Sequence, residues 1–211
     1  MWNWFLSLFK KKEVEAPKIE HPKDQTFLFG TKEWLHHEYL RGNVLPNWMR
    51  ETNRAITLIA KNLHRYKQVE LKTGVPYWVI ACIHYRESSL SFAGCLHNGD
   101  PLDKVTVHVP KGRGPFSSWE ESAIDALNYE MDLLKKGTWK PDWSIGGALD
   151  FMEKYNGLGY RKKGVHSCYL FSCTDIIRPK GRYTYDGFYN PLARTDDYLG
   201  VACIMKGLNI K

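Results

Sequence analysis

GVPYWVIACIHYRESSLS, residues 74–91, is the stretch on which the fold and the candidate site depend. Proline is tolerated in the first turn of a helix, so a helix is predicted to start after Gly74, at Pro76. Pro76, Ile80, Ile83 and Glu87 are spaced i, i+4, i+7 and i+11, and they therefore share one helical face. The stretch predicts a helix whose inward-facing side ends in a carboxyl group, that of Glu87.

A carboxyl group at the buried end of a helix has the properties of a general acid. Burial disfavours the charged form and raises the pKa of a carboxylic acid, so a proton is retained near neutral pH. Such a proton can be transferred to the leaving oxygen of a glycosidic bond. The alternative interpretation makes Glu87 an exposed residue at the helix end or a partner of Arg86, because structural ion pairs also perturb carboxyl groups.

The segment that follows this helix predicts a small β element. Residues 92–115, FAGCLHNGDPLDKVTVHVPKGRGP, are rich in Gly, Pro and Asp around an alternating TVHV segment. Alternation bounded by turn residues is typical of short strands joined by turns. Together with the helices, this segment predicts an α+β fold that is predominantly helical, with a small β-hairpin region after the helix of Glu87.

Four further helices are predicted from apolar spacing and capping signals. The apolar positions from Leu45 to Tyr66 follow helical spacing and predict one long helix with a single buried face. Ser117 and Ser118, each followed three residues later by Glu120 and Glu121, form capping-box signals for the next helix. Gly157 is placed to end a helix that begins near residue 145, and residues 198–208 predict a last helix.

Composition limits the classes of partner. The net charge of +7 and a pI near 9.1 favour polyanions, which include nucleic acid, anionic lipid and the bacterial cell wall. Lys and Arg cluster only at residues 10–12 and 161–163, so the pattern of a nucleic-acid-binding surface is missing and no nucleic-acid partner is expected. The 5 cysteines are odd in number and irregularly spaced, which indicates no disulfide framework and favours folding in a reducing cytosol.

The N-terminal residues 1–26 form a segment distinct from the domain predicted for residues 27–211. Residues 1–12, MWNWFLSLFKKK, place aromatic and leucine side chains before three lysines, and the apolar run is far shorter than the roughly 20 residues of a membrane span. This order fits a membrane-interface anchor or a peptide that docks on a virion or phage tail, and packing on the domain is the alternative. Residues 13–26 are polar, contain two prolines and predict a linker.

A helix-end Glu followed by Asp and Thr in a hairpin region resembles the small phage muramidases. In that family the Glu is the acid, while the Asp and the Thr position the attacking water or stabilise positive charge on the sugar. The resemblance implies catalytic roles for Glu87, Asp100 and Thr106. The segment between Glu87 and Asp100 is longer here than in the family, and the alternative for Asp100 is a turn former in HNGDP.

A second resemblance joins RESSLSF and YNGLGY to the motifs of goose-type lysozymes and soluble lytic transglycosylases. Those enzymes use one Glu and often no catalytic Asp. The resemblance implies that Glu87 is the acid and base, and that Ser88, Asn156 and Tyr160 line the sugar-binding groove. The Gly-Leu-Met-Gln motif usual in the transglycosylases is absent. Asn156 as a helix cap and Tyr160 as a packed ring are the alternatives.

The order of motifs from about residue 74 to the end resembles phage and prophage endolysin-like proteins. This likeness adds His97, Arg113, Trp119 and Tyr169 to the expected groove, with structural roles as the alternative for each. It also implies a lysozyme-like fold that cleaves the β-1,4 MurNAc-GlcNAc linkage of peptidoglycan. No metal and no organic cofactor is expected. The implied location is the host cytoplasm before lysis and then the periplasm and cell wall, or the virion. The alternative function is a catalytically inactive wall-binding or virion structural protein, because a fold does not imply an activity.

Overall fold

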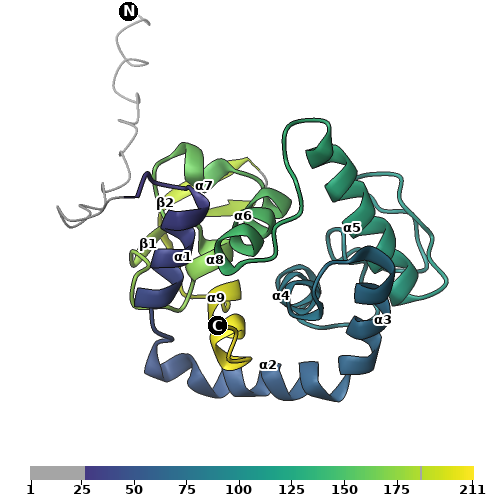
Figure 1. Cartoon of the computed structure of the whole chain (residues 1–211), viewed down its shortest axis with the longest axis horizontal. Helices are drawn as coiled ribbons and strands as arrows, with labels where there is room; N and C mark the ends of the chain where they lie inside the picture. Colours follow the sequence, from purple (N-terminus) through teal and green to yellow (C-terminus); the bar gives the residue numbers. More distant parts are fainter. Residues whose placement is uncertain (1–26, 186) are drawn as a thin grey trace, which may run out of the picture.

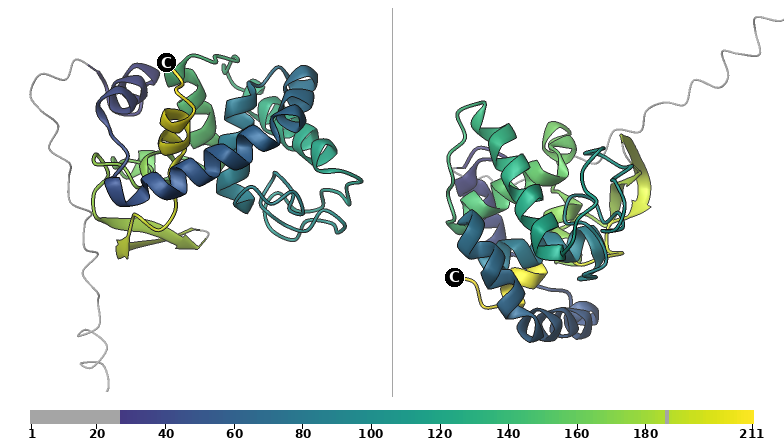
Figure 2. Two further views of the ribbon diagram at one scale, coloured as in Figure 1. Left: turned by 90° about the horizontal axis from the view of Figure 1, so that it is seen from below. Right: turned by 90° about the vertical axis from the view of Figure 1, so that its right-hand side faces the viewer.

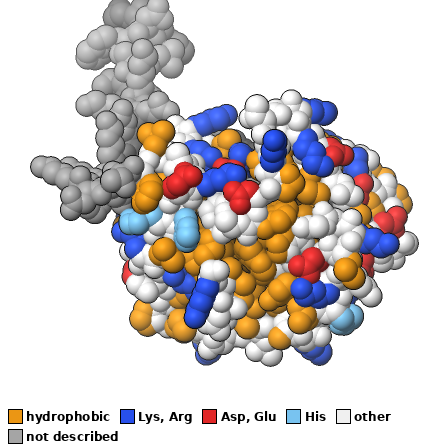
Figure 3. All heavy atoms as spheres, in the orientation of Figure 1, with side chains coloured by type: hydrophobic (Ala, Val, Ile, Leu, Met, Phe, Trp, Pro, Cys, Tyr) orange, Lys and Arg blue, Asp and Glu red, His pale blue; other side chains and the backbone are white. Residues whose placement is uncertain are grey.

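The computed structural model describes residues 27–185 and 187–211. The expected anchor and linker at residues 1–26 lie outside the described residues. None of the helices in the described part is long and apolar enough to cross a membrane. The face drawn in Figure 3 carries Lys and Arg interspersed with Asp and Glu around a central apolar band, and this face has no basic stripe.

The described residues form mostly helices and one antiparallel pair of strands (Figure 1). The helices are α1 (Lys32–Arg41), the 3-10 helix η2 (Pro46–Trp48), α2 (Met49–Lys61), α3 (Leu63–Thr73), α4 (Tyr77–Ser88), α5 (Trp119–Lys135), α6 (Ile145–Asn156), α7 (Gly159–Lys162), α8 (Cys168–Phe171) and α9 (Val201–Gly207). The strands are β1 (Lys180–Tyr185) and β2 (Phe188–Arg194). The predicted α+β class with a helical majority is confirmed at this level.

Helix α4 lies at the centre of the fold. Figure 1 shows it with α3 and α5 on one side and α6 and α9 on the other, and it packs directly against α3, α6 and α9. Its residues from Val79 to Ile83 are completely buried. The predicted start is confirmed, because Pro76 occupies the N-cap position. A helix buried on all sides holds the residues at its end in a fixed position relative to the whole core.

Two of the other predicted helices are confirmed in their capping details. The Ser118 hydroxyl accepts a hydrogen bond from the Glu121 backbone N–H at 3.1 Å, which begins α5 as the capping signal predicts. Gly157, with a φ of 97°, ends α6. The single long helix expected from Leu45 to Tyr66 is wrong, because the chain breaks at Asn62 between α2 and α3.

The position of the β-hairpin is a second correction. Residues 92–115 contain no strand, and their one β-type contact is an isolated bridge between Gly94 and Pro101. The strands lie instead at residues 180–194, where Tyr183 pairs with Tyr189 and Tyr185 with Phe188. In the left view of Figure 2, this hairpin and the long loop before α5 project from the same side of the helices.

Candidate functional site

The last turn of α4 is held by the buried ring of His84. The His84 Nδ1 lies 2.9 Å from the Tyr66 hydroxyl, and its Nε2 lies 3.0 Å from the Ser91 carbonyl oxygen. The ring also packs edge-on or tilted against the rings of Phe92 and Trp119. These contacts join α4, α3 and the following loop, so the backbone at Glu87 is fixed from both sides.

Glu87 keeps its carboxyl group in contact with a buried tyrosine. The Tyr169 hydroxyl donates a hydrogen bond to the Glu87 Oε1 at 2.9 Å, and the Arg86 guanidinium lies 4.9 Å from the centre of the Tyr169 ring. Burial raises the pKa of Glu87 to about 7, although the bond from Tyr169 and the charge of Arg86 act in the opposite direction. The protonated and ionised forms of this carboxyl are therefore both populated near neutral pH.

A hollow of about 380 Å³ lies beside Arg86 and Tyr169. It brings together three residues predicted to line a groove, Asn156, Tyr160 and Tyr169. The remaining lining residues come from the α6–α7 turn and the β hairpin: Gly157, Gly159, Tyr183, Thr184, Tyr185 and Gly187. Aromatic rings combined with amide, hydroxyl and guanidinium groups are suited to a ligand with apolar faces and many hydroxyls.

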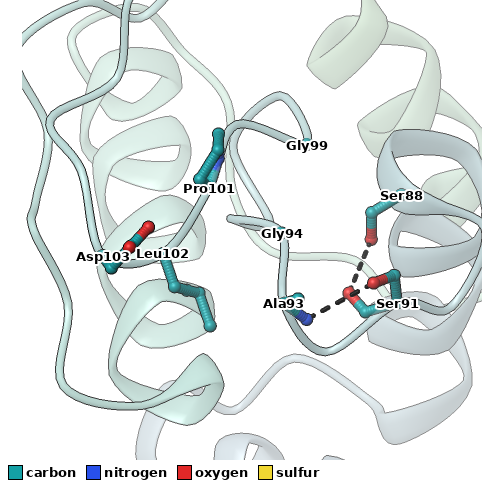
Figure 4. A pocket seen from close by; sticks show the side chains of 8 residues that line it. All are labelled: Ser88, Ser91, Ala93, Gly94, Gly99, Pro101, Leu102 and Asp103. Carbon is teal, nitrogen blue, oxygen red and sulfur yellow. Dashed lines mark hydrogen bonds between the residues drawn. The ribbon is translucent and has the colours of Figure 1, made fainter.

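A second hollow, of about 590 Å³, begins at Ser88 (Figure 4). Its lining continues through the loop after α4: Ser91, Ala93, Gly94, Gly99, Pro101, Leu102 and Asp103. The Ser88 hydroxyl donates to the Ser91 carbonyl oxygen at 3.1 Å, which keeps this predicted groove residue at the wall. A Cβ on Gly99 would lie 2.4 Å from the Glu87 carbonyl oxygen, so glycine allows the loop to close directly against the helix end.

Glu87 lines neither hollow itself, but both of its neighbours in α4 do. On a helix, residues two positions apart point about 200° from each other, so Arg86 and Ser88 face different sides of the helix end. Arg86 lines the hollow at the hairpin, and Ser88 lines the hollow at the loop. An elongated ligand that occupies both hollows would cross the end of α4, where Tyr169 lines the first hollow and bonds to the Glu87 carboxyl.

Asp100 lies in the loop that follows α4, and its carboxylate bonds to other residues of this loop. Its Oδ2 accepts hydrogen bonds from the backbone N–H groups of Val107 and His108 at 2.8 and 3.0 Å, and its Oδ1 lies 2.6 Å from the His108 Nδ1. Burial alone would raise the pKa of Asp100, but the bonds from His108 and Val107 hold it below its ordinary value. These contacts favour the turn-forming alternative for Asp100.

Thr106 is also part of the framework of the loop. Its hydroxyl donates to the Pro110 carbonyl oxygen at 2.6 Å and accepts from the Arg113 backbone N–H at 3.0 Å. The side chain is buried. Because both roles of the hydroxyl are used within the loop, the expected part of Thr106 in orienting water gains no support from its contacts.

His97 is placed on the far side of the loop, against α5. Its Nε2 lies 2.8 Å from the Asp125 Oδ2, and its ring stacks on Phe116 with centroids 5.5 Å apart. Arg113 shares the same Asp125 carboxylate through its Nε at 2.9 Å. His97 lines neither of the two hollows beside Glu87, so these contacts favour a structural role over the predicted sugar-binding role.

Sequence reasoning missed the aromatic wall that the hairpin supplies. Tyr183 and Tyr185 line the hollow beside Tyr169. The Tyr183 backbone N–H donates to the Tyr160 hydroxyl at 3.1 Å, which ties the hairpin to α7. The signal that could have found this wall is the recurrence of tyrosine in RYTY, residues 182–185, where both tyrosines point to one side of a strand.

Metal ligation finds no support among the residues that the structure describes, which contain no group of three or more His, Cys, Asp or Glu placed to hold an ion. The five cysteines are free and buried. Burial raises the pKa of the Cys82, Cys173 and Cys203 thiols, and Cys203 reaches about 12. Thiols with such pKa values are poor nucleophiles near neutral pH.

Replacing Tyr169 with Phe is expected to raise the pKa of Glu87 further above 7, by about 0.5 to 1, because a bond that stabilises the carboxylate is lost. A ¹³C NMR titration of the side-chain carboxyl measures this pKa directly. Tyr39→Phe is the matched control, since Tyr39 is also buried but its hydroxyl donates to the Ile210 carbonyl oxygen instead. If the pKa of Glu87 is equal in wild-type protein and in Tyr169→Phe, the Tyr169 hydroxyl does not stabilise the Glu87 carboxylate.

Comparisons with known proteins identify no relative of the chain. No protein-family profile matches it, and no curated protein or solved structure matches it. The functional assignment therefore depends on the geometry around Glu87 and on the chemistry of the residues that line the two hollows.

Proposed function

We propose that the chain is a peptidoglycan-cleaving glycosidase with a lysozyme-like fold and that Glu87 is its general acid. The observation that carries the proposal is the Glu87 carboxyl at the end of α4, which has a pKa raised to about 7 by burial and bonds to Tyr169, a lining residue of the adjoining hollow. A glycan strand is elongated, has apolar ring faces and carries many hydroxyls. Two hollows at the end of one helix suit the binding of the interior of such a strand.

In the proposed reaction, Glu87 protonates the oxygen of the glycosidic bond between N-acetylmuramic acid and N-acetylglucosamine. The bond from the anomeric carbon to this oxygen breaks, and positive charge develops on the sugar ring. Glu87, now a carboxylate, accepts the proton of the attacking hydroxyl. The bond from the Tyr169 hydroxyl at 2.9 Å stabilises this carboxylate and orients it.

Catalysis in this proposal depends on Glu87 without a second protein carboxylate. Both oxygens of Asp100 and the hydroxyl of Thr106 are engaged within the loop. The arrangement is that implied by the resemblance to goose-type lysozymes and lytic transglycosylases, in which one Glu acts as acid and base. The attacking hydroxyl is then either that of water or that of the sugar itself, and the latter gives a 1,6-anhydro product.

Mass spectrometry of the fragments released from purified peptidoglycan tests the proposal. Wild-type protein is expected to release muropeptides whose ends identify the attacking group. Reducing ends indicate water, and anhydro ends indicate the sugar hydroxyl. Absence of any released fragment from folded protein would contradict the proposed activity.

A wall-binding protein without turnover is the second candidate. The observation that favours it is that Asp100 and Thr106 bond within the loop, which leaves Glu87 as the one predicted catalytic group without such a role. Cosedimentation with purified peptidoglycan distinguishes the two candidates. Retained binding without fragment release supports the second candidate, and turnover excludes it.

A further inference from the structure

The tip of the β1–β2 hairpin presents two large aromatic side chains to solvent. The rings of Tyr185 and Phe188 stack with centroids 4.6 Å apart and an angle of 5° between their planes. They are 65% and 46% exposed, so two apolar rings that pack on each other leave much of their surface in contact with water. Such a pair contributes little to the core, which suggests a role in binding.

The base of the hairpin is rigid, which holds the exposed pair in place. Tyr160, Tyr183 and Tyr189 form a cluster of edge-to-face rings with centroids 5.0 to 6.5 Å apart. Gly181, with a φ of 100°, lets the strand pass close to the Tyr189 hydroxyl. A surface that is ordered before binding loses less conformational entropy when a ligand binds.

The exposed pair adjoins the hollow beside Arg86 and Tyr169. Tyr185 lines the same hollow as Tyr169, and the Tyr169 hydroxyl contacts the Glu87 carboxyl. Thr184 and Asn156 line this hollow as well and supply hydroxyl and amide groups between the two ends. A concave surface of this size accepts part of an oligomeric ligand rather than the flat surface of a protein partner.

We propose that Tyr185 and Phe188 form a stacking platform for a sugar ring of the bound glycan strand, beyond the sugars next to the Glu87 carboxyl. This inference rests on the proposed function, because it assigns the same glycan to the same cleft. The apolar face of an N-acetylated pyranose packs on the rings, while its hydroxyl and acetamido groups bind the polar residues of the hollow. The platform favours long strands over short fragments.

Calorimetric titration of the Glu87→Gln protein with soluble N-acetylglucosamine hexamers and dimers tests the platform. We expect Tyr185→Ala or Phe188→Ala, added to Glu87→Gln, to weaken hexamer binding by about fivefold to tenfold. Dimer binding should stay unchanged. Tyr185→Phe keeps the ring and should bind as the parent does. Leu192→Ala is the matched control, because Leu192 lies on the same hairpin and is 70% exposed, but it lines neither hollow.

The outcomes distinguish failure of the platform from failure of the proposed function. Hexamer binding that is unchanged in Tyr185→Ala, or absent from the parent protein, overturns the platform. An equal loss in Leu192→Ala also overturns it, since the effect would then come from the hairpin as a whole. If wild-type protein releases no fragments but hexamer binding depends on Tyr185, the platform stands and the glycosidase proposal fails.

Discussion

Glu87→Gln is expected to lower the rate of peptidoglycan cleavage by about two to four orders of magnitude, the usual contribution of a general acid. The amide has nearly the shape of the carboxyl but carries no transferable proton. Binding of the glycan should remain, because the hollows on either side are unchanged. The rate of fragment release at saturating substrate measures the effect.

Glu130→Gln is the matched control for this substitution. Burial raises the pKa of Glu130 as it does that of Glu87, but Glu130 lies on α5 and lines neither hollow beside α4. We expect Glu130→Gln to cleave at nearly the wild-type rate. Comparable losses in the two variants would show that catalysis does not depend on Glu87 alone.

Glu87→Gln also changes the free energy of unfolding, and the raised pKa of Glu87 fixes the direction of this change. Between the ordinary value of 4.5 and about 7, the folded protein holds a proton on Glu87 that the unfolded chain has released. The contribution of Glu87 to the free energy of unfolding is therefore fully present below pH 4.5, and it is lost as the pH rises through 7. Glu87→Gln lacks this loss and should be more stable than wild type at pH 8, by an amount on the order of 1–3 kcal/mol.

The sequence predicts elements well where a helix is buried or capped by local signals. Helix α4 starts at Pro76 and α5 at Ser118 as expected, because both starts depend on residues within one turn. The break at Asn62 was not predictable from apolar spacing, since the same spacing continues across it into α3. Local signals therefore set helix starts, while the tertiary fold decides whether a long pattern bends.

The β structure was misplaced for a physical reason. The TVHV segment pairs with no strand, and its alternation does not follow burial, because Thr106 is buried and bonds within the loop while Val107 and Val109 are exposed. The true hairpin shows no regular alternation of burial, since both of its faces are largely accessible. A period of two in the sequence therefore does not by itself indicate a strand or a buried face.

The candidate site was predicted in part. Glu87 and Tyr169 are in contact, and Asn156 and Tyr160 line the adjoining hollow. Asp100 could not be assigned from spacing, because the partners of its carboxylate, the N–H groups of Val107 and His108, depend on how the loop closes. The backbone groups that a side chain bonds to depend on the conformation of the folded loop. They cannot be inferred from a single sequence.

Glu38→Gln is expected to have the largest effect on stability, lowering the free energy of unfolding at pH 7 by about 3–5 kcal/mol. Glu38 is completely buried on α1, and its Oε2 lies 2.5 Å from the Nε2 of the equally buried His166. Arg41 binds both oxygens of the carboxylate at 2.7 Å. The amide of the variant carries no charge to match that of Arg41, and it replaces one of the carboxylate oxygens that Arg41 and His166 contact with a donor.

The effect of Glu38→Gln on stability should depend on pH, and the lowered pKa of Glu38 fixes the direction of this dependence. Burial alone would raise the pKa of Glu38, but the bonds from His166 and Arg41 lower it to about 2. Its contribution to stability is therefore present above the ordinary value of 4.5 and is lost as the pH falls towards 2. Urea unfolding at pH 7 and at pH 3 should give a smaller difference between wild type and Glu38→Gln at pH 3.

Glu33→Gln separates this effect from a general one on α1. Glu33 is exposed on the same helix, and its replacement should change the free energy of unfolding by no more than about 0.5 kcal/mol.

The contacts of Glu38 also bear on the candidate site at Glu87. The chain runs from His166 directly into α8, which carries Tyr169, the donor to Glu87. If Glu38 anchors this segment, Glu38→Gln should shift the pKa of Glu87 as well as lower stability. A stable Glu38→Gln protein with an unchanged Glu87 pKa would show that α8 is held by its packing against α6 and α9 alone.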